Sequence, residues 1–193
     1  MKAILMSIQP KWCELIASGK KTVEVRKTKP KLDVPFRVYM YCTNSKEMLW
    51  VLRENERAFT PEKIATICAA KNVGGAYKAN GKVIGEFVCD KLVWVLSHPD
   101  AFAGHPCYYT KALEDACMTE DEAETYSSGA DVYGYHISDL VIYDKPKRIG
   151  EFCKPCDRDP LCDCNYCKAH GRSPRYFITR PPQSWCYVEE VTP

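Results

Sequence analysis

The stretch Ser7-Ile-Gln-Pro-Lys-Trp-Cys-Glu-Leu-Ile-Ala-Ser-Gly-Lys-Lys-Thr-Val-Glu-Val-Arg26 carries the clearest structural signals in this chain. Pro10 suits the first turn of a helix, and Gly19 suits the position just after its end. Directly afterwards, residues 22–26 alternate between polar and apolar side chains. This alternation predicts a strand with its valines on one face and its charged side chains on the other.

The charged residues of this stretch are the first candidates for chemistry. Lys21 begins the strand close to Glu24, and a lysine beside a carboxylate can be tuned for proton transfer, so we predict this pair as catalytic. Arg26 is predicted as a ligand-binding residue, because a guanidinium group binds phosphate or carboxylate with two donors. The alternative is an edge strand whose charges are solvated or paired with one another. Substitutions would leave stability nearly unchanged on an open face, but they would cost several kcal/mol, about 3–5, within a buried pair.

Further elements are short, and they follow no regular βαβ order. Patterns typical of helices occur at about 61–71 and 111–126. Patterns typical of strands occur at 3–8, 36–42, 82–96, 133–143, 176–179 and 184–189. The sequence therefore predicts an α+β fold around a small mixed sheet or barrel.

Composition limits the class of protein. The chain has 193 residues, of which 46% are hydrophobic and 27% are charged, as in a globular protein rather than a disordered one. The longest apolar runs are only strand-sized, and the first residues lack the pattern of a signal peptide. We therefore expect a cytoplasmic protein without a membrane partner.

The charge is unevenly distributed along the chain. The formal net charge is only +2, which is too near neutral for binding nucleic acid without regard to sequence. Residues 1–37 nevertheless hold nine Lys or Arg residues against three acidic ones, whereas residues 111–140 hold one Lys against eight acidic residues. The N-terminal part can attract a phosphate or an acidic partner, unless the two regions are merely solvated faces that offset each other.

Five of the twelve cysteines crowd into one segment that ends near His170. Without a secretory signal, such crowding indicates a metal site rather than disulfides. Tetrahedral zinc takes four thiolate or imidazole ligands, and a filled set leaves no open position, so we predict one structural zinc ion. An iron–sulfur cluster and free or redox-active thiols are the alternatives. The candidate ligands are Cys153, Cys156, Cys162, Cys164 and Cys167, with His170 behind them.

The segment formed by the first helix and Gly-Lys-Lys-Thr-Val-Glu-Val-Arg26 resembles the signature of ASCH domains, which belong to the PUA-like superfamily. The stretches 83–90, 133–140, 142–146 and 180–189 resemble a phage- and bacterium-associated branch of that family. The resemblance implies a PUA-like mixed β-barrel with flanking helices and a cleft beside the first helix. One domain would then span residues 1–193, with the cysteine-rich segment at about 150–172 as an inserted zinc-binding loop.

The resemblance also implies a role with RNA or nucleotides. Some small ASCH proteins are amidohydrolases that remove the acetyl group from N4-acetylcytidine, and others are reported to cut RNA. Lys21 matches the lysine of the amidohydrolase pattern, but Glu24 occupies the position of its threonine. The later glutamate of that pattern corresponds to one of Glu120, Glu122 and Glu124.

We therefore expect this chain to bind RNA or a (modified) nucleotide, with Gln9, Arg26 and His136 as ligand-binding residues. His136, in an aromatic strand, is either a core histidine or a residue that contacts a base. One alternative is a hydrolase that uses Lys21 and Glu24. Another is an interaction module whose zinc loop binds a protein partner.

Overall fold

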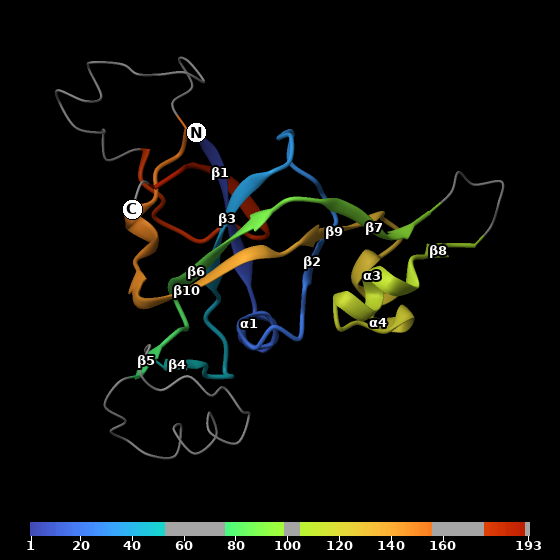
Figure 1. The fold of residues 1–193 in the computed structure, drawn as a ribbon, viewed down its shortest axis with the longest axis horizontal. Helices are drawn as coiled ribbons and strands as arrows, with labels where there is room; N and C mark the ends of the chain where they lie inside the picture. Colours follow the sequence, from blue (N-terminus) through green and yellow to red (C-terminus); the bar gives the residue numbers. More distant parts are fainter. Residues whose placement is uncertain (53–75, 99–104, 156–175, 192–193) are drawn as a thin grey trace. The chain divides into compact units, whose positions relative to one another are not determined.

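The computed structural model describes residues 1–52, 76–98, 105–155 and 176–191 (Figure 1). It confirms a mixed α+β fold. The chain forms two compact units, and it passes between them four times. The first unit comprises residues 1–14, 37–86 and 141–193, and the second comprises residues 15–36 and 87–140.

A mixed five-stranded sheet lies mainly in the first unit, with the strand order β10-β6-β3-β1-β11. Strand β1 pairs in parallel with β3 and antiparallel with β11, and its apolar side chains are buried on both faces of the sheet. The strands are β1 (Lys2–Ile8), β3 (Phe36–Cys42), β6 (Lys82–Cys89), β10 (Ser138–Lys147) and β11 (Trp185–Glu189). The core on one side of this unit gathers Ala3, Leu5, Tyr39, Tyr41, Val83, Phe152, Ile178 and Val188.

Smaller elements complete the first unit. Strands β4 (Trp50–Leu52) and β5 (Ala76–Lys78) form a separate antiparallel pair. A short 3-10 helix, η2 (Ile149–Glu151), follows β10. Helix α1 (Pro10–Ala17) begins in the first unit and ends in the second, just before Gly19. Gly19 has a φ of +72°, which glycine adopts without steric cost, and this explains the end of the helix.

The second unit is a four-stranded sheet with two short helices on one face. The strand order is β2 (Val23–Arg26), β9 (Val132–His136), β7 (Leu92–Ser97) and β8 (Cys107–Tyr108). Helices α3 (Thr110–Asp115) and α4 (Glu120–Ser127) pack against β7. A Cβ atom at Gly134 would lie within 3.0 Å of three valine side chains from the neighbouring strands, so only glycine lets the apolar face close here.

Most elements expected from the sequence are confirmed, but several differ. The strand patterns at 82–96 and 133–143 each correspond to two strands, β6 with β7 and β9 with β10. The acidic helix expected at 111–126 is divided into α3 and α4, because Cys117 has a φ of +53° and Thr119 starts a new helix with a capping box. The strand expected at 176–179 is reduced to an isolated bridge between Cys153 and Phe177. The expected barrel is not closed in the described ranges, whose strands form separate sheets instead. The helix expected at 61–71 lies outside the described residues.

None of the helices in the described ranges is both long and apolar enough to cross a membrane.

Candidate functional site

Strand β2 and the residues directly before it place the predicted charged side chains in the interior of the second unit. Lys21, Glu24 and Arg26 are only 2%, 2% and 8% exposed. The polar face of this strand is therefore not open to solvent, and its charges are paired with one another in the interior. One face packs its valines into the core with α3 and α4. The other face is covered because Glu24 lies opposite Tyr135, which is fully buried and meets the ring of Phe36 edge-on at 6.2 Å.

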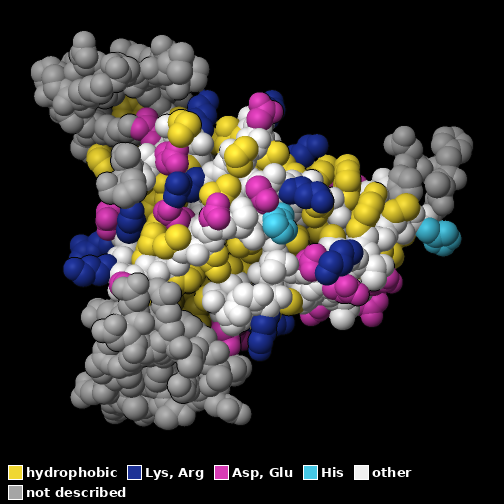
Figure 2. All heavy atoms as spheres, viewed as in Figure 1, with side chains coloured by type: hydrophobic (Ala, Val, Ile, Leu, Met, Phe, Trp, Pro, Cys, Tyr) yellow, Lys and Arg dark blue, Asp and Glu magenta, His cyan; other side chains and the backbone are white. Residues whose placement is uncertain are grey.

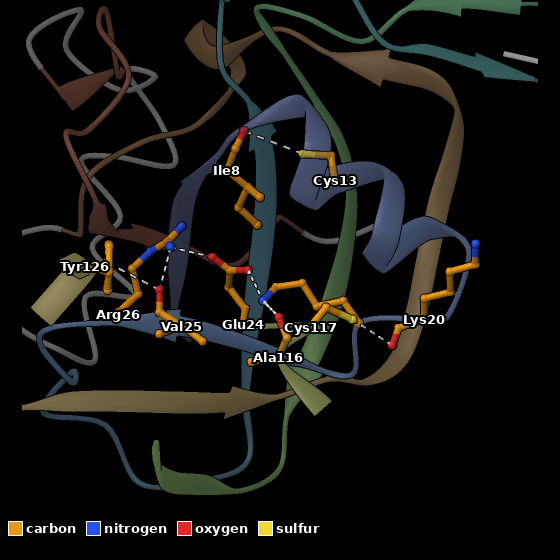
Figure 3. A network of polar contacts seen from close by, with 10 residues as sticks. Ile8, Cys13, Lys20, Glu24, Val25, Arg26, Ala116, Cys117 and Tyr126 are labelled. Carbon is orange, nitrogen blue, oxygen red and sulfur yellow. Dashed lines mark hydrogen bonds and ion pairs between the residues drawn. The ribbon is translucent and has the colours of Figure 1, made fainter. Parts of the chain in front are cut away.

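The three charged side chains form one network, which we call the Lys21–Glu24–Arg26 cluster (Figure 3). Lys21 Nζ donates a hydrogen bond to the carbonyl of Ala116 at 2.6 Å and lies 3.7 Å from Glu24 Oε2. Glu24 Oε1 forms an ion pair with Arg26 Nη1. Arg26 Nη1 also donates to the carbonyl of Val25 at 2.7 Å. The carboxylate of Glu24 thus lies between two cations.

Burial controls the electrostatics of this cluster. It lowers the pKa of Lys21 below the ordinary value for lysine, and the nearby Glu24 carboxylate opposes that shift. Glu24 Oε2 is buried and takes part in no hydrogen bond within the described part of the chain. The cluster therefore combines a lysine of lowered pKa with an oxygen of Glu24 that can accept a hydrogen bond.

The turn between α3 and α4 completes the surroundings of Lys21. Ala116 supplies the carbonyl acceptor, and the carbonyl of Asp115 accepts a hydrogen bond from the amide of Thr22 at 2.9 Å. Cys117 Sγ donates to the carbonyl of Lys20 at 3.3 Å. Sequence reasoning missed this turn, because it acts through backbone atoms far along the chain from Lys21. Cys117 in this turn has a left-handed conformation, which sequence patterns usually assign to glycine or asparagine. The turn contains neither residue, so the pattern gave no signal for it.

The structure places His136 away from Arg26 along the same pair of strands. His136 lies opposite Val23, whereas Arg26 lies opposite Tyr133, three residues along, which corresponds to about 10 Å. The side chain of His136 is 41% exposed, and its Nδ1 lies 2.6 Å from Asp90 Oδ1. This hydrogen bond lowers the pKa of Asp90. His136 is therefore not a core histidine, and its side chain is open to a ligand.

Gln9 lies in the first unit, directly before α1. Its side chain is exposed, and its carbonyl accepts hydrogen bonds from the amides of Trp12 and Cys13 at 3.0 and 2.9 Å. The backbone of Gln9 thus begins the helix, while its side chain is open to solvent.

The glutamates of α4 have other partners. Glu122 closes the capping box with Thr119, and Glu124 Oε2 accepts a hydrogen bond from the hydroxyl of Tyr108 at 2.9 Å. Glu120 is exposed in the first turn of the helix. These roles give no support to any of the three as the later glutamate of the amidohydrolase pattern.

Only the beginning of the cysteine-rich segment is described. Cys153 is buried and carries no disulfide. Cys156, Cys162, Cys164, Cys167 and His170 lie outside the described residues. Elsewhere in the described ranges, no group of three or more His, Cys, Asp or Glu side chains is arranged to hold a metal ion.

Comparison with known proteins supports the family resemblance for part of the chain. The family model of the ASCH domain matches residues 6–88, which include the Lys21–Glu24–Arg26 cluster. No curated protein matches. Among solved structures, the chain is similar to the crystal structure of ASCH from Zymomonas mobilis, with 17% identity, a TM-score of 0.46, and coverage of 97% of this chain and 88% of that one. A mutant of that protein gives 17% identity, a TM-score of 0.45, and coverage of 98% and 92%. The ASCH resemblance is thus confirmed for residues 6–88, while the phage-associated branch stays a prediction.

Proposed function

We propose that this chain binds RNA or a (modified) nucleotide as a single ASCH domain, with the Lys21–Glu24–Arg26 cluster at the binding site. One observation carries the proposal: the segment that matches the ASCH model holds a lysine, a glutamate and an arginine together in the protein interior. Because the chain passes between the two units four times, neither unit is a continuous segment of the chain.

The energetics of burial support a functional role for the cluster. Removing charges from water costs several kcal/mol for each ion, and apolar residues of similar volume would often stabilise a core as well or better. Two cations that share one carboxylate also favour an approaching anion such as a phosphate. Arg26 is the most exposed of the three side chains, so we propose that it meets the phosphate first.

The test is direct binding. Fluorescence anisotropy with a labelled single-stranded RNA, and mass spectrometry of nucleotides that co-purify with the protein, should both detect a ligand. Arg26→Lys keeps the charge but loses the planar double donor, so it should weaken binding. Lys145→Ala, which removes an exposed lysine, is the control and should bind like the parent. If the parent protein binds neither RNA nor any nucleotide or nucleoside, the proposal is wrong.

A hydrolase is the second candidate function, favoured by the lowered pKa of Lys21 and by Glu24 Oε2, which lacks a hydrogen bond in the described structure. In this role Glu24 would take a proton from a water molecule, which then attacks a nucleobase amide or an RNA phosphodiester. Lys21 would return a proton to the leaving group. Turnover of N4-acetylcytidine or of labelled RNA, lost in Glu24→Gln, would support this role. Absence of turnover in the parent protein would contradict it.

We also propose that the cysteine-rich segment holds one structural zinc ion. The described residues at its two ends support a separate loop. The amide of Lys154 donates to the carbonyl of Tyr176 at 2.7 Å, and that of Ile178 donates to the carbonyl of Phe152 at 2.8 Å. Elemental analysis should find close to one zinc per chain, whereas an absence of zinc or the presence of disulfides in this segment would contradict the proposal. Binding of a protein partner through this loop is the remaining alternative.

A further inference from the structure

The sheet of the second unit has an aromatic pair on the face opposite its helices. Trp94 of β7 lies directly opposite Tyr133 of β9, and Tyr133 in turn lies opposite Arg26 of β2. Side chains of residues directly opposite each other in antiparallel strands point to the same face. The aromatic pair therefore shares a face with Arg26, at one end of the Lys21–Glu24–Arg26 cluster.

This pair is accessible and preorganised. The two ring centroids are 4.7 Å apart with an interplanar angle of 40°, and Trp94 is 39% exposed. The apolar core of the unit lies on the other face, where the valines of β2 and β7 pack around Gly134. Packing of the core on the helix-covered face therefore does not explain why a tryptophan, Trp94, lies on the opposite face.

Positive charge accompanies the rings. Lys29 Nζ lies 5.3 Å from the ring centroid of Tyr133, within the range of a cation–π interaction. Lys29 and Lys31 are exposed and follow Arg26 closely in the chain. Figure 2 shows hydrophobic side chains next to Lys and Arg side chains over the region of β7 and β9. We call Trp94, Tyr133 and Lys29 the stacking platform.

We propose that the stacking platform binds an unpaired base of a single-stranded RNA, with the adjacent phosphate held by Lys29 and directed toward Arg26. Exposed aromatic rings interleaved with basic side chains are the features by which proteins bind single strands, because every base offers a π face and every nucleotide a phosphate. A duplex keeps its bases stacked internally, so it fits this surface less well. This inference rests on the proposed function. It adds the form of RNA, a single strand, and the residues that distinguish a single strand from a duplex.

The test compares matched variants in anisotropy titrations. The probe is a labelled, unstructured RNA of about 12 nucleotides, measured alone and annealed to its complement. The parent protein should prefer the single strand. Trp94→Ala should weaken its binding by about 5- to 150-fold, the range for loss of one base–aromatic stack, and Trp94→Phe should restore part of the loss. Tyr109→Ala is the control, because Tyr109 is a comparably exposed aromatic residue of the same unit, 43% exposed, at the start of α3.

Lys29→Ala provides an independent measurement. It should reduce the slope of log affinity against log salt concentration by about one unit, as expected for one lost phosphate contact. Melting curves show whether each variant is folded. If Trp94→Ala does not fold, the affinity of Trp94→Phe for the single strand is compared with that of the parent instead.

The outcomes test the stacking platform and the proposed function separately. If the parent protein binds single-stranded RNA but the Trp94 and Lys29 variants bind it equally well, the platform is wrong and the proposed function stands. If the parent prefers the duplex, the platform is also wrong. If the parent binds no RNA, nucleotide or nucleoside, both fail. If Trp94→Ala abolishes self-association or binding of a protein and leaves RNA binding intact, the surface is a protein interface and the inference is overturned.

Discussion

Each unit contains an arginine paired with carboxylates, and the two networks are built differently. In the first unit, Arg37 forms ion pairs with Glu86 and Glu190, and the hydroxyl of Tyr143 also donates to Glu86. The side chains of Arg37 and Glu86 are 34% and 15% exposed, so water still reaches them. In the second unit, the Lys21–Glu24–Arg26 cluster is almost fully enclosed, and one carboxylate serves two cations.

The two networks also differ in how fully the oxygens of their carboxylates are hydrogen-bonded. Glu86 has a hydrogen-bond donor for each of its oxygens, and burial with the bond to Glu86 raises the pKa of Tyr143. Every partner there is satisfied, as in a structural network. Glu24 Oε2, by contrast, is buried without a hydrogen bond in the described structure, and the burial of Lys21 lowers its pKa. A perturbed pKa occurs in both networks, so the buried oxygen without a hydrogen bond is what distinguishes the cluster, and it fits the binding role that we propose.

The largest effect that follows from this comparison is the loss of stability in Glu24→Gln. The substitution leaves Lys21 and Arg26 enclosed without the carboxylate between them, and removal of one partner from a buried ionic network costs about 3–5 kcal/mol. For a chain of this length that lowers the melting temperature by roughly 6–20 °C. Urea unfolding followed by circular dichroism measures the free energy. A change within about 0.5 kcal/mol would mean that the cluster is solvated in solution.

Glu86→Gln should have a smaller effect. Its side chain is partly exposed, so water can replace part of the lost interaction with Arg37, while the amide oxygen still accepts one hydrogen bond. The expected cost is about 1.5–3 kcal/mol, the value of one hydrogen bond to a charged group. The same urea titration, run in parallel with Glu24→Gln, gives the ratio of the two effects. Equal losses would show that burial does not distinguish the networks.

The sequence predicts the secondary structure that carries the cluster, but it does not predict that the cluster is buried. Pro10, Gly19 and the alternation of β2 act over a few residues, so the helix and the strand could be read directly from the pattern. The burial of Glu24 and Arg26 could not, because these residues lie opposite Tyr135 and Tyr133 of β9, which is more than a hundred residues away in the chain. An alternating strand identifies two faces, but only tertiary packing decides whether one of them is open.

The same limit explains the other differences. Lys21 was identified from its neighbours, but its acceptor is a backbone carbonyl, which has no residue type to recognise. The break between α3 and α4 depends on a left-handed Cys117, a conformation that sequence patterns assign to glycine or asparagine. The barrel was implied by resemblance alone, since local patterns give strands and do not determine whether a sheet closes.

The response of stability to pH tests the burial of Lys21 more finely. Because burial lowers the pKa of folded Lys21, the unfolded chain binds more protons between that lowered pKa and about 10.5. Stability from this group therefore rises with pH across that window and levels off above it. The difference in unfolding free energy between the parent and Lys21→Met should grow by at most about 1.4 kcal/mol for each pH unit. Urea titrations between about pH 8 and pH 10 measure it, and a difference independent of pH would mean that Lys21 has an ordinary pKa.

The smallest expected effect concerns zinc: its removal should hardly change the packing of the core of the first unit. This prediction rests on the proposed metal, and its reason lies in the described residues. Backbone hydrogen bonds join Phe152 and Lys154 to Ile178 and Tyr176, and the carbonyl of Cys153 accepts a further bond from the amide of Glu189 in β11. The two ends of the cysteine-rich segment are thus held by the protein's own backbone, and Phe152 packs against Tyr39 with ring centroids 4.9 Å apart. Chelation should release zinc and leave the near-ultraviolet signal of these aromatic residues unchanged. If that signal collapses together with the loss of metal, zinc supports the core, and the network around Arg37 and Glu86 is not sufficient to hold the first unit together.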